Sequence, residues 1–301
     1  MSFLRRVFFF LLTNLAVILL INIVFALLQA FFGINISAYG YDYLSIFIFA
    51  GIVGSLGAFV SLFLSKWSAK RIYNIELLTK QNYSSFSPKE VLFYNTVLEI
   101  SEKNHIKMPE LGVYISPDPN AFATGATKNS SLVAVSSGLL DSMEKNEIEA
   151  VVAHEMAHIL NGDMVTMTLL QGILNTFVIF ISRVIANIAD AYFGKEEKGP
   201  SFIYYIVSFV LELFLGILAS FVVMWFSRKR EFRADEGSAK FVGKEKMIQA
   251  LEALKRVSSV QIDTETKFAS FKINAKKKGG IKSLLASHPS LEKRIENLKN
   301  L

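Results

Sequence analysis

Long uncharged apolar blocks are the feature that most restricts how this chain can fold. The first runs from about residue 7 to 28 and the second from about 44 to 65, and neither contains a charged side chain. At ~1.5 Å per helical residue, such blocks can cross a hydrocarbon layer about 30 Å thick. The first block is too long for a signal-peptide core and no small-residue cleavage site follows it, so we expect it to remain as an anchor.

Two further apolar blocks, at about 165 to 187 and 202 to 226, predict a second membrane hairpin. The alternative is a buried helical hairpin of a soluble domain. Apolar residues make up 52% of the chain and charged residues only 19%, and this balance favours the membrane. Glu212 lies near the middle of the last block, where facing lipid would be costly, so we expect it to face Asn175, Arg183 or a polar cavity.

Basic residues predict the orientation of these spans, because cytoplasmic flanks are enriched in Lys and Arg. The loop 29–43 contains neither residue type, whereas basic clusters occur at the outer ends of the hairpins. These clusters are Arg5 with Arg6, Lys66 with Lys70 and Arg71, and the run Arg228, Lys229 and Arg230. We therefore expect the N-terminus and both polar regions to be cytoplasmic. The net charge of +6 is explained by topology, and no nucleic-acid-binding motif is present, so no nucleic-acid partner is expected.

The chain thus divides into a membrane hairpin at 1–70, a polar part at 71–163, a second hairpin at 164–227 and a second polar part at 228–301. Within the polar parts, the residue patterns predict helices and short strands. The predicted strands are 111–116, 120–125 and 131–140, and the predicted helices are 88–104, the segment around 154, 244–258 and the segment after 290. The predicted fold is a mainly α membrane protein with about four transmembrane helices and a cytoplasmic α+β domain containing a small sheet.

The segment HEMAH, residues 154–158, predicts a metal site. The chain has only four histidines, and two of them stand here four residues apart, so that both side chains project from one helix face. Glu155 points slightly aside and suits a general base acting on a metal-bound water, as peptide hydrolysis requires. The chain has no cysteine, so a zinc ion would need His, Asp or Glu ligands. The alternative is a chance match on an amphipathic helix.

The third ligand must come from elsewhere, because Met164 occupies the position six residues after His158. The segment 228–235 follows the last apolar block and carries two acids four residues apart, Glu231 and Asp235. Either could be the ligand, and the other could hold an imidazole in the correct tautomer. Chemistry alone leaves both assignments open.

Several motifs, in order, resemble the HtpX family of membrane zinc metalloproteases, which are relatives of the CAAX prenyl protease. They are NAFATG at 120–125, LVAVSSGLL at 132–140, VVAHEMAHILNGDM at 151–164, SRKREFRADEGSA at 227–239 and HPSLEKRI at 288–295. The resemblance implies a gluzincin-like catalytic domain with one zinc ion per chain. On this basis His154, His158 and Glu231 are the metal ligands, Glu155 is the catalytic base, and Asp235 supports a ligand.

The same resemblance implies a role in the bacterial plasma (inner) membrane, in stress response and membrane quality control. The expected activity is ATP-independent endoproteolysis of misfolded or damaged membrane proteins, or of unfolded proteins, at the cytoplasmic face of the lipid bilayer. Functional overlap with other quality-control proteases is also expected.

Two further groups of residues are expected at the cleft if the resemblance holds. An extended substrate could pair with the rim strand through main-chain hydrogen bonds, and the alternative is a merely structural strand. The predicted rim residues are Asn120, Ala121, Phe122 and Ala123. The terminal HP…R pattern places His288 or Arg294 near the cleft, where either could stabilise an oxyanion. The alternative is that His288 only flanks a helix.

Two other functions fit part of this pattern. An intramembrane protease would carry HExxH inside an apolar segment, whereas here the motif follows a polar run. A transporter or scaffold could bind metal structurally, but it would leave Glu155 without a task. The sequence therefore favours a membrane-anchored zinc endopeptidase.

Overall fold

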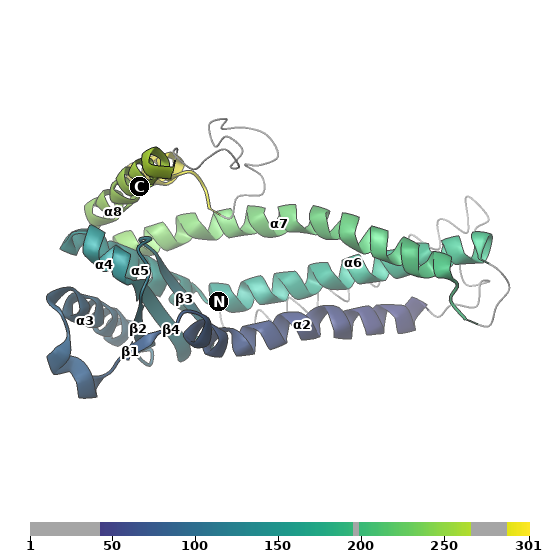
Figure 1. Ribbon diagram of the computed structural model, residues 1–301, viewed down its shortest axis with the longest axis horizontal. Helices are drawn as coiled ribbons and strands as arrows, with labels where there is room; N and C mark the ends of the chain where they lie inside the picture. The colour runs from purple at the N-terminus through teal and green to yellow at the C-terminus, as the bar shows by residue number, and fades with distance from the viewer. Residues whose placement is uncertain (1–42, 195–198, 266–287) are drawn as a thin grey trace. The chain divides into compact units, whose positions relative to one another are not determined.

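The computed structural model describes residues 43–194, 199–265 and 288–301 (Figure 1). The first apolar block, at 7–28, and the basic pair Arg5 and Arg6 lie outside these residues. The chain divides into two compact units. Unit 1 comprises residues 1–61 and 166–223, and unit 2 comprises residues 62–165 and 224–301.

The three apolar blocks within the described residues all form helices. They lie in α2 (Tyr43–Ile72), α6 (Asp163–Phe193) and α7 (Phe202–Val242), and each helix is long and apolar enough to cross a membrane. The helices run further than the apolar blocks. In particular, the segment 228–235 belongs to α7, which continues as far as Val242.

In unit 1, small residues allow α2 and α6 to pack closely. A Cβ atom added to Gly54 would lie 2.6 Å from the backbone nitrogen of Thr176, so only glycine fits at this contact. Asn175 donates a hydrogen bond to the Gly54 carbonyl at 3.3 Å, and Phe47 meets Phe180 edge to face. Glu212 contacts one of its expected partners, Arg183, at 3.5 Å.

Unit 2 contains a four-stranded sheet in the order β1-β2-β4-β3. Its strands are β1 (Glu76–Leu78), β2 (Glu110–Tyr114), β3 (Ala121–Thr127) and β4 (Ser130–Ser136). The strands β2 and β4 pair in parallel, and the other two pairings are antiparallel. The strand expected over 131–140 ends at Ser136, because this side chain accepts a hydrogen bond from the Leu139 N–H and starts α4 (Ser137–Ser142).

The helices of unit 2 enclose one hydrophobic core. Besides α4, they include the 3-10 helix η2 (Lys80–Ser85), α3 (Pro88–Lys103), α5 (Lys145–Asn161), α8 (Lys244–Glu265) and α10 (Leu291–Lys299). A capping box starts α3: the Ser87 hydroxyl accepts a hydrogen bond from the Glu90 N–H, and the Glu90 carboxylate accepts one from the Ser87 N–H. Fully buried side chains of α3, α5 and α8, including Phe93, Ile148 and Leu251, meet in this core. The helix α5 lies along β3 and packs against α3 and α8, so its position is fixed from several sides (Figure 1).

Candidate metal centre

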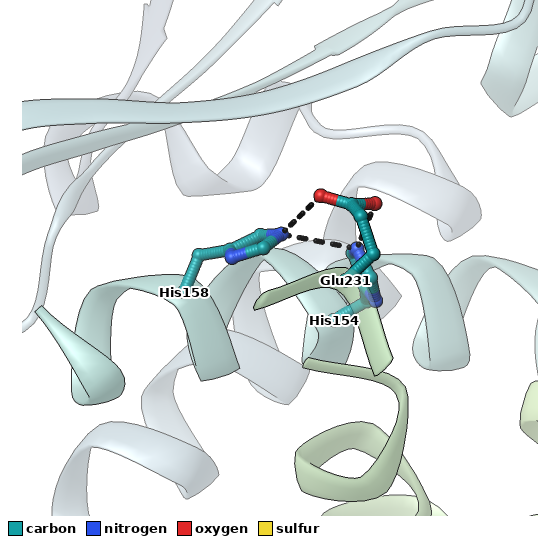
Figure 2. A group of neighbouring side chains, drawn as sticks. All are labelled: His154, His158 and Glu231. Carbon is teal, nitrogen blue, oxygen red and sulfur yellow. Dashed lines mark hydrogen bonds and ion pairs between the residues drawn. The ribbon is translucent and has the colours of Figure 1, made fainter. Parts of the chain in front are cut away.

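Helix α5 presents the two histidines of HEMAH toward one point. His154 and His158 are 6% and 8% exposed, and their Nε2 atoms lie 3.2 Å apart (Figure 2). The helix ends directly afterwards, because Gly162 adopts a left-handed conformation with φ of 66° that glycine tolerates best. This turn redirects the chain into α6.

Helix α7 brings Glu231 to the histidines. A Cβ atom added to Gly237 would lie 2.6 Å from the Cβ of Ala157, so α7 approaches α5 more closely than a larger residue would allow. The Ser238 hydroxyl donates to the Ala150 carbonyl at 2.8 Å and fixes the register of the two helices. Glu231 is consequently 1% exposed and faces both rings (Figure 2).

The three side chains fit a single metal ion. The Glu231 carboxylate oxygens lie 3.6 Å from the Nε2 of His154 and 3.4 Å from the Nε2 of His158. Ligands bound to zinc at about 2.0–2.1 Å in a tetrahedral arrangement are separated by roughly 3.3 Å, which matches these distances. The Oε1 atom of Glu231 is buried without a hydrogen-bond partner among the described residues. A cation would supply the missing partner.

Each histidine has a carboxylate on its other ring nitrogen. The Nδ1 of His154 lies 2.9 Å from Asp235, and the Nδ1 of His158 lies 2.7 Å from Asp163. A carboxylate at Nδ1 favours the tautomer in which Nε2 is free to bind a metal. Sequence reasoning identified Asp235 but missed Asp163. The available signal was an acid directly after Gly162, but only the helix-ending turn shows that it reaches back to His158.

Helix α10 closes the site with Arg294. Its guanidinium is 6% exposed and makes two hydrogen bonds to the Asp235 carboxylate, at 2.8 and 2.6 Å. Its Nη1 atom also lies 3.6 Å from Glu231. His288, just before α10, lies with its Nδ1 2.8 Å from Glu231, while its side chain remains 61% exposed. The structure thus brings both residues of the HP…R pattern to the site.

The charges of the site favour a divalent cation. Among the described residues, Asp163, Glu231 and Asp235 are buried carboxylates and Arg294 is the buried guanidinium beside them, and these four groups together leave two negative charges when the imidazoles are neutral. Burial lowers the pKa of His158, but the hydrogen bond with Asp163 and the contact with Glu231 prevail and raise it to about 9. Burial likewise opposes ionisation of Glu231, yet His154, His158 and His288 hold its pKa well below the usual range. The site therefore attracts positive charge.

Glu155 and β3 complete the surroundings of the two histidines. Glu155 is half-buried on α5, and its charge acts on both His158 and Arg294. The strand β3 forms one edge of the sheet in the part of the chain that the structure describes, and it packs along α5. Of the predicted rim residues, Ala121, Phe122 and Ala123 lie in β3 beside the metal-binding helix, and Asn120 directly precedes the strand.

The free edge of β3 exposes the main chain of alternate residues. The Ser136 N–H donates to the Asn120 carbonyl at 2.9 Å, and the Asn120 N–H donates to the Ser136 hydroxyl at 2.9 Å, so these two residues face each other across the strands. In the register that continues from them, Phe122 directs its N–H and C=O toward β4. Ala121 and Ala123 then direct theirs to the free edge, while their side chains pack on the core.

Comparisons with known proteins agree with this geometry. The model of peptidase family M48 matches residues 94–301. Protease HtpX of Tolumonas auensis is 48% identical over 301 residues, covering 99% of each chain. Protease HtpX of Alkalilimnicola ehrlichii is 47% identical, covering 98% of this chain and 97% of that protein.

A solved structure shares the fold. The crystal structure of S. mikatae Ste24p superposes with a TM-score of 0.56 at 20% identity. The match covers 91% of this chain, which spans 64% of the length of that one. The matched family model, the full-length relatives and the membrane-spanning helices together show that this chain belongs to peptidase family M48 as a membrane metalloprotease of the HtpX type.

Proposed function

We propose that this protein is a zinc-dependent endopeptidase at the cytoplasmic face of the bacterial inner membrane. It cleaves misfolded or damaged membrane proteins without ATP. The observation that carries the proposal is the buried triangle of His154, His158 and Glu231, whose ligand atoms lie within 3.2 to 3.6 Å of one another.

Zinc is the metal that this ligand set suits best. Two imidazoles with one carboxylate are typical of catalytic zinc, which retains an open position for water. Magnesium and calcium prefer all-oxygen sites. The carboxylates of Asp163 and Asp235 on the two Nδ1 atoms are the usual outer partners of zinc-binding histidines.

When bound, zinc would polarise the scissile carbonyl and the attacking water. The Glu155 carboxylate takes a proton from that water as its oxygen bonds to the carbonyl carbon. Glu155 then delivers the proton to the amide nitrogen as the carbon–nitrogen bond breaks. The protons balance, because the base returns to its carboxylate form. Glu155 suits this role since it lies on the same helix as both ligands and is only half-buried.

His288 and Arg294 have different roles in the proposal. His288 is 61% exposed while touching Glu231, so it can also reach a substrate and donate to the developing oxyanion. Arg294 is buried and makes both of its strong hydrogen bonds with Asp235. This arrangement favours positioning of Asp235 and His154 over direct contact with substrate.

The substrate is proposed to bind as an additional strand on β3. The outward N–H and C=O groups of Ala121 and Ala123 supply main-chain hydrogen bonds that any extended peptide can satisfy. Such recognition reads backbone rather than side chains. It therefore suits a protease whose substrates share an unfolded state rather than a sequence.

The test is proteolysis of casein by the full chain in detergent micelles, without nucleotide. Glu155→Gln should retain the wild-type metal content and lose cleavage, and the matched control Glu149→Gln on the same helix should retain both. Cleavage by Glu155→Gln at the wild-type rate would refute the base assignment. A requirement for ATP would refute that part of the proposal.

The cytoplasmic orientation has a separate test. Because the chain has no cysteine, a single cysteine at the exposed position Lys103 of α3 reports the side on which unit 2 lies. In intact cells, a membrane-impermeant maleimide should label this variant only after the inner membrane is opened. Labelling of unopened cells would show that unit 2 lies on the opposite side of the membrane and would contradict the cytoplasmic orientation.

A further inference from the structure

The two tryptophans of the chain occupy equivalent places in unit 2. Trp67 lies near the end of α2, and Trp225 lies where the apolar part of α7 ends. Both indoles are largely exposed, at 60% and 52%. Tryptophan has an apolar ring and one polar N–H, and in membrane proteins it is enriched where hydrocarbon meets the headgroups.

A cationic side chain from the next helical turn lies over each indole ring. The Arg71 guanidinium lies 5.9 Å from the centroid of the Trp67 ring, and the Lys229 ammonium lies 4.7 Å from the centroid of the Trp225 ring. In both cases the cation is four residues later and therefore beyond the apolar segment. The same ring-then-cation order thus occurs on two separate helices of unit 2.

The charge around both rings is positive at the surface. Among residues 62–72 and 224–235 the only acids are Glu231 and Asp235, and these are 1% and 0% exposed. Glu110, from β2, pairs with Lys66 and Lys70, and Arg71 adds a further positive charge beside Trp67. The exposed cations of these segments include Arg71, Lys229 and Arg233. Long basic side chains can keep their stems in apolar surroundings while their charges reach the headgroups. An anionic surface is the complementary partner.

We propose that Trp67, Arg71, Trp225 and Lys229 form an interfacial belt that seats unit 2 in the headgroup layer of an anionic phospholipid bilayer. The belt explains why the rings remain exposed and why each is followed by a cation rather than an acid. It is a surface for a lipid partner and stands apart from the metal-binding residues.

The belt also sets the distance of the metal centre from the bilayer surface. Trp225 and Glu231 are six residues apart on the unbroken helix α7, so the ligand is about 9 Å further along the helix than the ring. Tyr73, one residue beyond α2, contacts the Phe122 ring of β3 at 5.3 Å between centroids. If the proposed function holds, cleavage takes place in substrate segments that have just left the bilayer.

The experiment uses the full chain with the Glu155→Gln substitution, reconstituted into phosphatidylcholine vesicles containing phosphatidylglycerol. Trp67→Phe and Trp225→Phe each leave a single fluorescent indole. Lipids carrying a nitroxide at the headgroup, at a shallow acyl position or at a deep acyl position are the quenchers. Both indoles should be quenched most by the headgroup or shallow probes and to similar extents. Strongest quenching by the deep probe, or quenching by aqueous acrylamide alone, would overturn the belt.

A second arm tests the charge. In mixed vesicles, nitroxide-labelled phosphatidylglycerol should quench about two-fold more than equally labelled phosphatidylcholine. Arg71→Gln with Lys229→Gln should lower this ratio toward one, whereas Lys80→Gln with Lys299→Gln, two exposed lysines elsewhere in unit 2, should leave it unchanged. Inorganic phosphate should leave the ratio unchanged, because the partner is a lipid headgroup and not a free anion.

Equal ratios in the wild type would overturn the anionic preference. Loss of lipid quenching as the protein-to-lipid ratio rises would show that a second copy covers the belt, and this would also overturn the proposal. Metal content serves as the check that each variant is folded. Because the belt is measured without cleavage, its failure and failure of the proposed function are distinguishable.

Discussion

Arg183 and Glu212 in unit 1 form a loose charged pair, whereas Arg294 and Asp235 in unit 2 form a tight one. The first pair meets at 3.5 Å, and neither Arg183 Nε nor Glu212 Oε1 makes a hydrogen bond among the described residues. The second pair makes two hydrogen bonds, at 2.8 and 2.6 Å, and is buried. Both pairs join two helices, but only the second is part of a larger network.

The difference follows from what surrounds each pair. In unit 2, Asp235 also holds His154, so its position decides where a metal ligand points. In unit 1, the remaining strong hydrogen bond of Arg183 goes to the Tyr204 hydroxyl at 2.9 Å, and no metal-binding group depends on it. The comparison teaches that the tight network of unit 2 serves the geometry of the site. The pair between α6 and α7 has no such constraint.

The largest effect is expected from Glu231→Ala. This change removes one of the three proposed ligands and leaves two histidines, so metal affinity should fall by more than the roughly 100-fold that loss of an outer partner costs. Metal content per chain after gel filtration measures the effect. Glu236→Ala on the same helix is the matched control. An undiminished metal content in Glu231→Ala would remove this residue from the ligand set.

Arg294→Met tests the tight pair directly. It leaves the buried Asp235 carboxylate without its guanidinium, and breaking a buried pair in this way costs about 3–5 kcal/mol. Denaturant unfolding of the full chain in micelles measures the loss. Asp235→Asn combined with Arg294→Met should recover part of it, because the unpaired charge is then gone. Lys293→Met, at an exposed neighbouring position, should change little. Equal stability of Arg294→Met and Lys293→Met would refute the importance of the pair.

Asp163→Asn should have the next largest effect, through the metal rather than through stability. The carboxylate on His158 Nδ1 holds the ring with Nε2 toward Glu231, and loss of such a partner lowers metal affinity by about 10–100-fold. Competition with a chelator of known affinity measures the change. Asp141→Asn, at an exposed site, is the control. An affinity equal to that of the control would show that Asp163 does not position His158.

Much of the fold was predictable because its signals are local. Charge-free length identified the apolar helices, and the helix predicted at 88–104 corresponds to α3, whose start is marked locally by the Ser87–Glu90 capping box. The strand β1 was missed because three residues are too few to show a period. The end of β4 was placed too late, because residues 137–140 continue the apolar run although Ser136 caps a helix there.

The site shows a similar limit. The two histidines were readable because four residues span about one helical turn. Glu231 and Asp235 are also four apart on one helix, so spacing alone could not tell which one faces Nε2 and which one faces Nδ1. Only the packing of α7 on α5, with Gly237 against Ala157, separates these positions. The resemblance to a family supplied the assignment that local chemistry could not.

The smallest effect is expected in unit 1, from a double-mutant cycle of Arg183→Met and Glu212→Gln. Polar contacts between membrane helices average about 0.6 kcal/mol and reach about 1.7 kcal/mol, because the unfolded reference state also finds partners. The coupling energy should fall in this range, since the Tyr204 hydroxyl remains available to Arg183 in the Glu212 variant. Denaturant unfolding in micelles measures the stability of the wild type, the two single variants and the double variant. Casein cleavage by all three variants should match that of the wild type. A coupling as large as the loss caused by Arg294→Met would mean that the loose pair is also a fixed element of the structure. The two charged pairs would then differ only in the residues that surround them and not in the strength of their interaction.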